Sequence, residues 1–89
     1  MPKAYLVRLF GDVQGVGMRQ YVWRNAKKLG ITGYVKNLED GSVEILAQTS
    51  QDTLNKLLEK VKHYPMATIK RIEVKETETD SQLNDFEIH

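Results

Sequence analysis

The glycine-rich segment from Gly11 to Gly17 constrains the fold of this 89-residue chain more than any other part of it. Residues 5–10, just before it, alternate as expected for a strand that is covered on one face. After it, apolar residues recur at helical spacing until Gly30 supplies a stop: Met18, Val22, Ala26 and Leu29. Because glycine adopts backbone angles that other residues avoid, three glycines in seven residues allow a tight turn between the two elements. The sequence therefore predicts a strand, a tight loop and a helix in that order.

A hairpin is predicted directly after this unit. Residues 31–37 have the composition of a strand, and Asp40-Gly41 is a strong signal for a two-strand turn. The next strand is indicated by residues 42–48, where apolar side chains take every second position. The two strands therefore pair antiparallel across the turn.

The second half of the chain repeats the helix and strand signals. Ser50 is a typical N-cap, and the helix after it carries an apolar stripe that ends before Pro65: Leu54, Leu57, Leu58 and Val61. Residues 69–75 indicate a fourth strand, and a polar loop over 77–85 leads to Phe86 and Ile88. These last residues predict a short edge strand at the C-terminal side.

The resulting order is β-α-β-β-α-β, which predicts a ferredoxin-like α/β sandwich formed as a single domain over residues 1–89. We expect an antiparallel sheet with two helices on one face. The first helix is a right-handed crossover, so the strands on either side of it run parallel with another strand between them. Their carboxyl ends therefore share one edge, where the glycine loop and Asn37 lie roughly 10 Å apart, or two strand spacings.

Composition excludes several classes of protein. The chain has no cysteine, which removes disulfides, thiolate metal ligands and cysteine nucleophiles. A net charge of +1 is too small to attract nucleic acid by field alone. The start of the chain lacks the features of a signal peptide, and no apolar run approaches the roughly 20 residues that cross a bilayer. We expect a cytoplasmic monomer with neither a nucleic-acid nor a membrane partner.

The glycine loop has the features of a phosphate site. Its backbone precedes a helix N-terminus, where unpaired N–H groups and the helix dipole both favour an anion. Arg19 lies in the first turn, where the dipole disfavours a cation, so its guanidinium fork suits an anionic partner that it can bind through two oxygens. The alternative is that the glycines only permit a tight connection and that Arg19 is an ordinary solvated side chain.

Missing motifs narrow the chemistry of such a site. The chain has no Gly-Lys-Ser/Thr segment for nucleotide and magnesium, and no dinucleotide fingerprint, so no cofactor and no metal are expected. Val13 stands where a thiol phosphatase needs its cysteine, which leaves water as the nucleophile. Asn37 can orient that water through its side-chain oxygen. Alternatively, Asn37 caps the strand end before the turn over 38–41.

The run Gly11-Asp12-Val13-Gln14-Gly15-Val16-Gly17-Met18-Arg19 resembles the signature of the acylphosphatase family, and the resemblance continues through Gly33-Tyr34-Val35-Lys36-Asn37 and over essentially the whole chain. It implies metal-independent hydrolysis of acyl phosphates, which are small carboxyl-phosphate anhydrides, to carboxylate and inorganic phosphate. By position, Arg19 would be the phosphate-binding catalytic arginine and Asn37 the water-positioning catalytic asparagine. The backbone of Gln14, Gly15, Val16, Gly17, Met18 and Arg19 would complete the phosphate cradle.

Two positions depart from the family pattern. Met18 replaces the phenylalanine that usually precedes the arginine, and His89 replaces a terminal aromatic or arginine residue. They leave open a second function, a non-catalytic module that uses the same cradle to hold a phosphorylated or carboxylated ligand. An RNA-binding domain of the same topology is a third alternative, disfavoured by the near-neutral charge.

Overall fold

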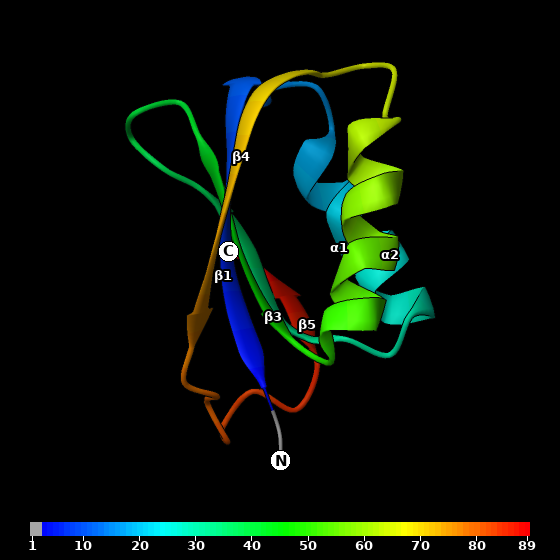
Figure 1. Cartoon of the computed structure of the whole chain (residues 1–89). Coiled ribbons are helices and arrows are strands. Elements are labelled where there is room, and N and C mark those ends of the chain that lie inside the picture. The colour runs from blue at the N-terminus through cyan, green and yellow to red at the C-terminus, as the bar shows by residue number, and fades with distance from the viewer. Residues whose placement is uncertain (1–2) are drawn as a thin grey trace.

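The structure, a computed structural model, describes residues 3–89; Met1 and Pro2, the first residues of the predicted domain, lie outside the described residues. The elements follow the predicted order, with the expected short strand at the end: β1 (Ala4–Asp12), α1 (Met18–Lys28), β2 (Thr32–Asn37), β3 (Val43–Gln48), α2 (Gln51–Lys62), β4 (Thr68–Thr77) and β5 (Phe86–Ile88). Both helices lie on the same side of a twisted sheet, as Figure 1 shows.

The sheet has the strand order β4-β1-β3-β2-β5. β1 pairs antiparallel with both β3 and β4, and β2 pairs antiparallel with β3. β1 and β2 therefore run parallel with β3 between them, which confirms the predicted crossover and the ferredoxin-like fold. β5 adds to β2 in the parallel direction, so the complete five-stranded sheet is mixed rather than wholly antiparallel.

Local sequence signals explain where the helices begin and end. Gly30 has a φ of 73°, and the N–H groups of Gly30 and Ile31 donate to carbonyls in the last turn of α1, a Schellman-type ending. At the start of α2 the Ser50 hydroxyl accepts from the backbone N–H of Thr53 at 3.2 Å, which confirms the predicted cap. Within residues 3–89 no helix is long and apolar enough to span a membrane.

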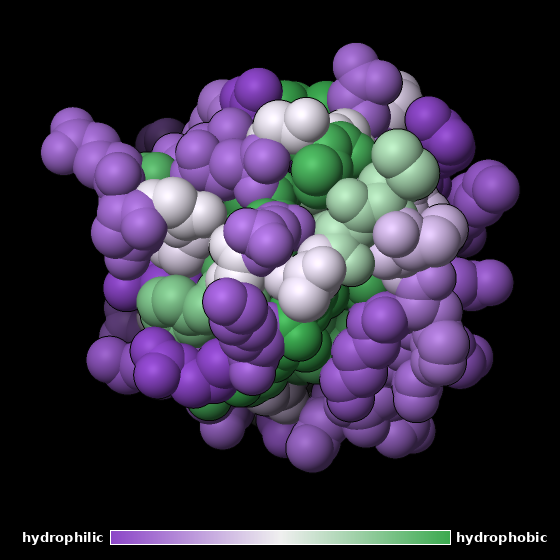
Figure 2. Space-filling model, turned by 90° about the horizontal axis from the view of Figure 1, so that it is seen from above, coloured by the Kyte–Doolittle hydropathy of each residue, from purple (hydrophilic) through white to green (hydrophobic). Residues whose placement is uncertain are grey.

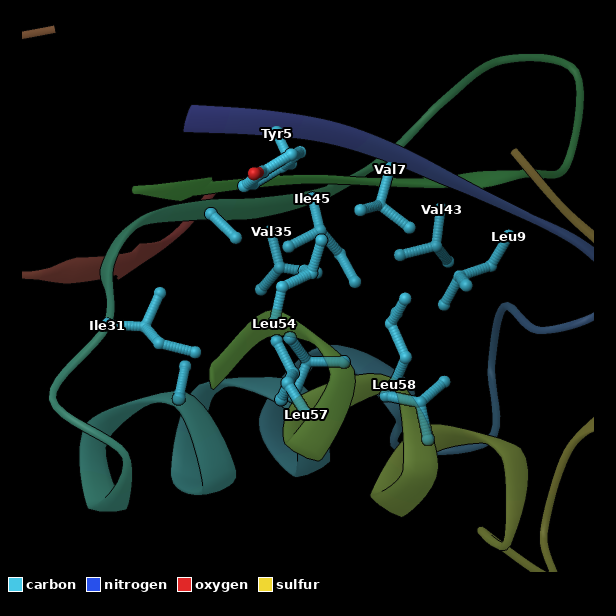
Figure 3. Close-up of a cluster of buried hydrophobic side chains, with 14 of the residues drawn as sticks. Tyr5, Val7, Leu9, Ile31, Val35, Val43, Ile45, Leu54, Leu57 and Leu58 are labelled. Atoms are coloured by element: carbon cyan, nitrogen blue, oxygen red, sulfur yellow. The ribbon is translucent and has the colours of Figure 1, made fainter. Parts of the chain in front are cut away.

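The core fills the space between the sheet and the helices. Figure 3 shows apolar side chains of the sheet facing those of α2. Val7, Leu9 and Ile45 on the inner strands are fully buried, as is Leu57 on α2. Such close packing resists deformation, so the inner strands form a rigid support for the loops at their ends. The loop after β1 and the turn after β2 both lie at the upper end of the molecule in Figure 1.

Candidate active site

A pocket of about 210 Å³ lies where the carboxyl ends of β1 and β2 meet the N-terminus of α1. Figure 2, which views this end from above, shows apolar residues near the centre of the surface among polar ones. The loop, the first turn of α1 and the end of β2 supply the lining residues: Val13, Gly15, Gly17, Met18, Arg19, Gln20 and Asn37. The pocket thus brings together Arg19 and Asn37, the two residues that the sequence placed at one sheet edge.

The glycine loop offers unpaired backbone donors to this pocket. Within residues 3–89, none of the hydrogen bonds uses the N–H of Gln14, Gly15, Val16 or Gly17. Gly17 is the N-cap of α1, with a φ of 79°, and no side chain caps the helix. The first turn also contains no acidic residue that would compete for the dipole. A loop and helix start of this kind can bind an anion through N–H groups.

Arg19 adds the positive side chain of the pocket. Met18, the residue before it, is 2% exposed and packs into the core, so the helix start is anchored while the next side chain faces outward. The exposed guanidinium of Arg19 donates from Nη1 to the backbone oxygen of His89 at 2.9 Å. One of its donor groups is therefore held by the residue that follows β5. The other donors have no protein acceptor within residues 3–89, and they are able to bind oxygens of a ligand.

Asn37 lies at the last position of β2, half-buried, with its backbone paired to Val43. Its side-chain amide makes no hydrogen bond to any residue in 3–89. The following turn is closed by other groups: the Leu38 N–H donates to the Ser42 oxygen, and Asp40 Oδ1 accepts from both the N–H and the hydroxyl of Ser42. The capping alternative for Asn37 therefore loses support, and the amide is available to a water or ligand in the pocket.

The bonds from Ser42 also stabilise the ionised form of Asp40. They hold the pKa of Asp40 below its ordinary value, because both the hydroxyl and the N–H stabilise the ionised carboxylate. Asp40 therefore stays ionised, and able to accept both hydrogen bonds, to lower pH than an aspartate without these partners.

Gln14 and Val16 are the two predicted cradle residues that do not line the pocket. The side-chain amide of Gln14 reaches across to the turn after β2, where Nε2 donates to the backbone oxygens of Leu38 at 2.7 Å and Ser42 at 2.9 Å. Gln14 thus ties the loop to the strand end that carries Asn37. Only the backbone N–H groups of these two residues remain as donors for an anion.

Three residues at or behind the pocket had no role in the site predicted from sequence, although His89 stood out as a departure from the family pattern. Gln20 lines the pocket next to Arg19, His89 accepts from Arg19, and the Tyr64 hydroxyl donates to the backbone oxygen of Val16 at 2.6 Å. Gln20 could have been found from its place in the first turn of the helix. The other two depend on contacts between distant parts of the chain. Across residues 3–89 no group of three or more His, Cys, Asp or Glu side chains is arranged to hold a metal ion.

The fold and the pocket together define a ferredoxin-like α/β protein with a glycine-rich loop between its first strand and first helix. A model of the acylphosphatase family matches residues 5–88. The chain therefore belongs to the acylphosphatase family. Members of this family are hydrolases that act on acid anhydrides. Membership implies a small-molecule acyl-phosphate substrate.

Individual relatives agree with this assignment. The chain is 44% identical to the acylphosphatase of Shewanella amazonensis over 84 residues, which cover 93% of this chain and 92% of the relative. It resembles the crystal structure of acylphosphatase from Bacillus subtilis with a TM-score of 0.89 and 37% identity, covering 100% and 99% of the two chains. It also matches HypF from T. kodakarensis with a TM-score of 0.84 and 36% identity, over 98% of this chain but 12% of that longer one.

Proposed function

We propose that this chain hydrolyses acyl phosphates to carboxylate and inorganic phosphate by direct attack of water, without a metal ion. One pocket supports this assignment most directly, since it combines the unpaired N–H groups of the glycine loop, the guanidinium of Arg19 and the side-chain amide of Asn37. The first two suit a phosphoryl group. The third suits a water beside it.

The phosphoryl group is bound by the loop and Arg19. Its oxygens accept from the N–H groups between Gln14 and Arg19 and from the guanidinium, which supply positive charge around phosphorus. Phosphoryl transfer through a loose transition state depends on positioning and charge stabilisation more than on covalent help. Hydrogen-bond donors that are fixed in place before the substrate binds therefore account for most of the rate enhancement.

Water attacks phosphorus from the side of Asn37. The Asn37 side-chain oxygen accepts a hydrogen bond from the water and aims its lone pair at phosphorus. As the new O–P bond forms, the P–O bond to the acyl group breaks, and the carboxylate leaves with the bonding electrons. One proton of the water stays on the attacking oxygen, and the other passes to a second oxygen of the phosphate. Because a carboxylate is a stable leaving group, no general acid is required at the pocket.

Hydrolysis of benzoyl phosphate in excess chelator tests this proposal. We expect phosphate release by the unmutated chain, and a loss of about 10³-fold or more for Arg19→Ala, by analogy with arginines that stabilise phosphoryl transfer. Arg24→Ala is the matched control, because Arg24 is exposed on the same helix and does not line the pocket. No turnover by the unmutated chain, with phosphate still bound, would instead assign the chain as a binding module.

Asn37→Ala tests the role of the amide separately. We expect kcat to fall about 10²- to 10³-fold while KM and phosphate affinity change little, because the amide acts on water rather than on the anion. Asn55→Ala, an exposed position on α2, is the control. A large loss of phosphate affinity with unchanged kcat would contradict this role.

We further propose that residues 1–89 act as one cytoplasmic, monomeric domain with no nucleic-acid or membrane partner. The near-neutral net charge of +1 supports the absence of nucleic-acid binding. Light scattering that shows a dimer, or oligonucleotide binding that falls steeply with salt, would contradict these proposals.

A further inference from the structure

The peptide units of the glycine loop need a support outside the loop. Val16 is flanked by Gly15 and Gly17, whose φ values are 75° and 79°. Glycine adopts either sign of φ at little cost, so the peptide unit between Val16 and Gly17 can rotate more easily than one between bulkier residues. The start of α1 has no side-chain cap, so no capping side chain holds this peptide unit in place.

Tyr64, in the connection between α2 and β4, makes a contact that restrains this peptide. Its hydroxyl donates to the backbone oxygen of Val16 at 2.6 Å. The ring is itself fixed, because it stacks on Tyr21 of α1 with the centroids 4.2 Å apart and the planes at 23°. The Tyr21 hydroxyl in turn donates to the backbone oxygen of Lys60, in the last turn of α2, at 3.0 Å. The hydroxyl of Tyr64 is thus presented to the loop by a pair of packed rings.

The direction of the Val16 carbonyl determines the direction of the next N–H. The carbonyl of Val16 and the N–H of Gly17 belong to one planar trans peptide, in which the two groups point in opposite directions. Tyr64 and Val16 do not line the pocket, whereas Gly17 does. A bond that turns the carbonyl toward Tyr64 therefore turns the N–H of Gly17 toward the pocket.

We propose that Tyr64 is a positioning residue of the phosphate site, which holds the Gly17 N–H in the orientation that binds the anion. This role depends on one part of the proposed function, the binding of phosphate in the pocket, and does not require hydrolysis. Without the hydroxyl the peptide rotates, and the N–H spends part of its time directed away from the anion. The expected loss is about three- to tenfold in phosphate affinity, as for one hydrogen bond.

The test compares two tyrosine variants of the same stack. Tyr64→Phe keeps the ring and removes the bond to Val16, whereas Tyr21→Phe keeps the ring and removes the bond to Lys60. The affinity for inorganic phosphate is measured by calorimetry, together with the KM for benzoyl phosphate and the Tm. We expect Tyr64→Phe to weaken phosphate binding and raise KM about three- to tenfold. Tyr21→Phe keeps both the ring stack and the bond to Val16, so both quantities should change less than about twofold at a comparable Tm.

Unchanged phosphate affinity in Tyr64→Phe would overturn the proposal. So would an equal loss in Tyr21→Phe, because the effect would then come from the packing of the stack. If the unmutated chain binds phosphate without hydrolysing benzoyl phosphate, the proposed hydrolysis fails, yet the two affinities still decide the role of Tyr64. If it binds no phosphate at all, both proposals fail.

Discussion

The side-chain amide of Gln14 donates to the backbone oxygen of Leu38 at 2.7 Å and so joins the glycine loop to the turn after β2. A second bond from the same nitrogen reaches Ser42 across the turn. The two bonds span 24 and 28 residues of the chain, and within residues 3–89 only Gln14 links the loop to this turn by side-chain hydrogen bonds. We therefore expect this side chain to help set the distance between the proposed phosphate cradle and Asn37.

Gln14→Ala is expected to reduce kcat about 10- to 100-fold while phosphate affinity changes less than about threefold. The cradle keeps its own N–H groups, but a shift near 1 Å between the water-positioning amide and the phosphoryl group costs about 10²-fold. Steady-state kinetics and phosphate calorimetry separate the two effects. Full activity in Gln14→Ala would show that the rest of the fold sets the distance.

Gln48→Ala is the matched control for this variant. Gln48 Nε2 also donates to two oxygens, the hydroxyl of Thr32 and the backbone of Leu83, but at the opposite end of β3. Gln48 Oε1 also accepts from the Asp80 N–H, so the variant should lose at least as much stability as Gln14→Ala, yet retain kcat. A comparable fall in kcat would attribute the Gln14 result to general loosening of the sheet.

Gly17→Ala is expected to lower both stability and phosphate affinity. A φ of 79° costs a non-glycine residue about 1–2 kcal/mol, and the added Cβ would lie 3.0 Å from the Tyr64 hydroxyl oxygen. Gly30→Ala carries the same backbone cost, with a φ of 73°, and meets no atom within 4 Å. Urea unfolding should show similar losses in the two variants, with weaker phosphate binding in Gly17→Ala alone. Equal affinities would contradict the expected role of the Gly17 position.

The order of the elements could be predicted because each has a local signal. The glycine loop, the Asp40-Gly41 turn and the Ser50 cap mark boundaries within a few residues, and the apolar stripes give the type of each helix. The direction of β5 had no such signal. Three residues contain too little pattern to tell a parallel from an antiparallel pairing. Contacts with distant residues fix β5 beside β2: Phe86 is buried, its backbone oxygen accepts from Trp23 Nε1, and the His89 N–H donates to the backbone oxygen of Val35.

The site could be predicted only where its chemistry follows from position along the chain. Arg19 and Asn37 could be placed beside one pocket because a helix start and a strand end share one edge in this topology. The bonds of Gln14, Tyr64 and His89 join segments 24 to 70 residues apart, so they depend on strand register and helix packing. Short-range periodicity carries no information about such contacts.

Phe86→Ala should destabilise the fold by about 3–5 kcal/mol, the usual range for a fully buried aromatic. Phe86 is 2% exposed and anchors β5, whereas Ile88 on the same strand is 40% exposed. Ile88→Ala should therefore cost about 1 kcal/mol or less. Urea unfolding measures both, and Phe86→Leu provides a milder variant if Phe86→Ala does not fold. Equal losses at the two positions would show that the buried ring is not what holds β5.

Tyr34 should make the fold sensitive to alkaline pH. Burial, the hydrogen bond that its hydroxyl donates to Glu44 at 2.8 Å, and the charge of Glu44 together raise the pKa of Tyr34 from 10.0 to about 12. The folded chain therefore holds this proton more tightly than the unfolded chain, so the contribution to stability is complete below pH 10. It is lost as pH rises from 10 toward 12, where the unfolded chain ionises first.

Tyr34→Phe removes this group and should flatten the fall in unfolding free energy over that pH interval. Glu44→Gln keeps a hydrogen-bond acceptor but removes the negative charge, so the pKa of Tyr34 should fall only part of the way back to its ordinary value, because burial still raises it. Urea unfolding at a series of pH values and ultraviolet titration of the phenol measure the two effects. The same alkaline slope in Tyr34→Phe as in the unmutated chain would place the sensitivity at another residue.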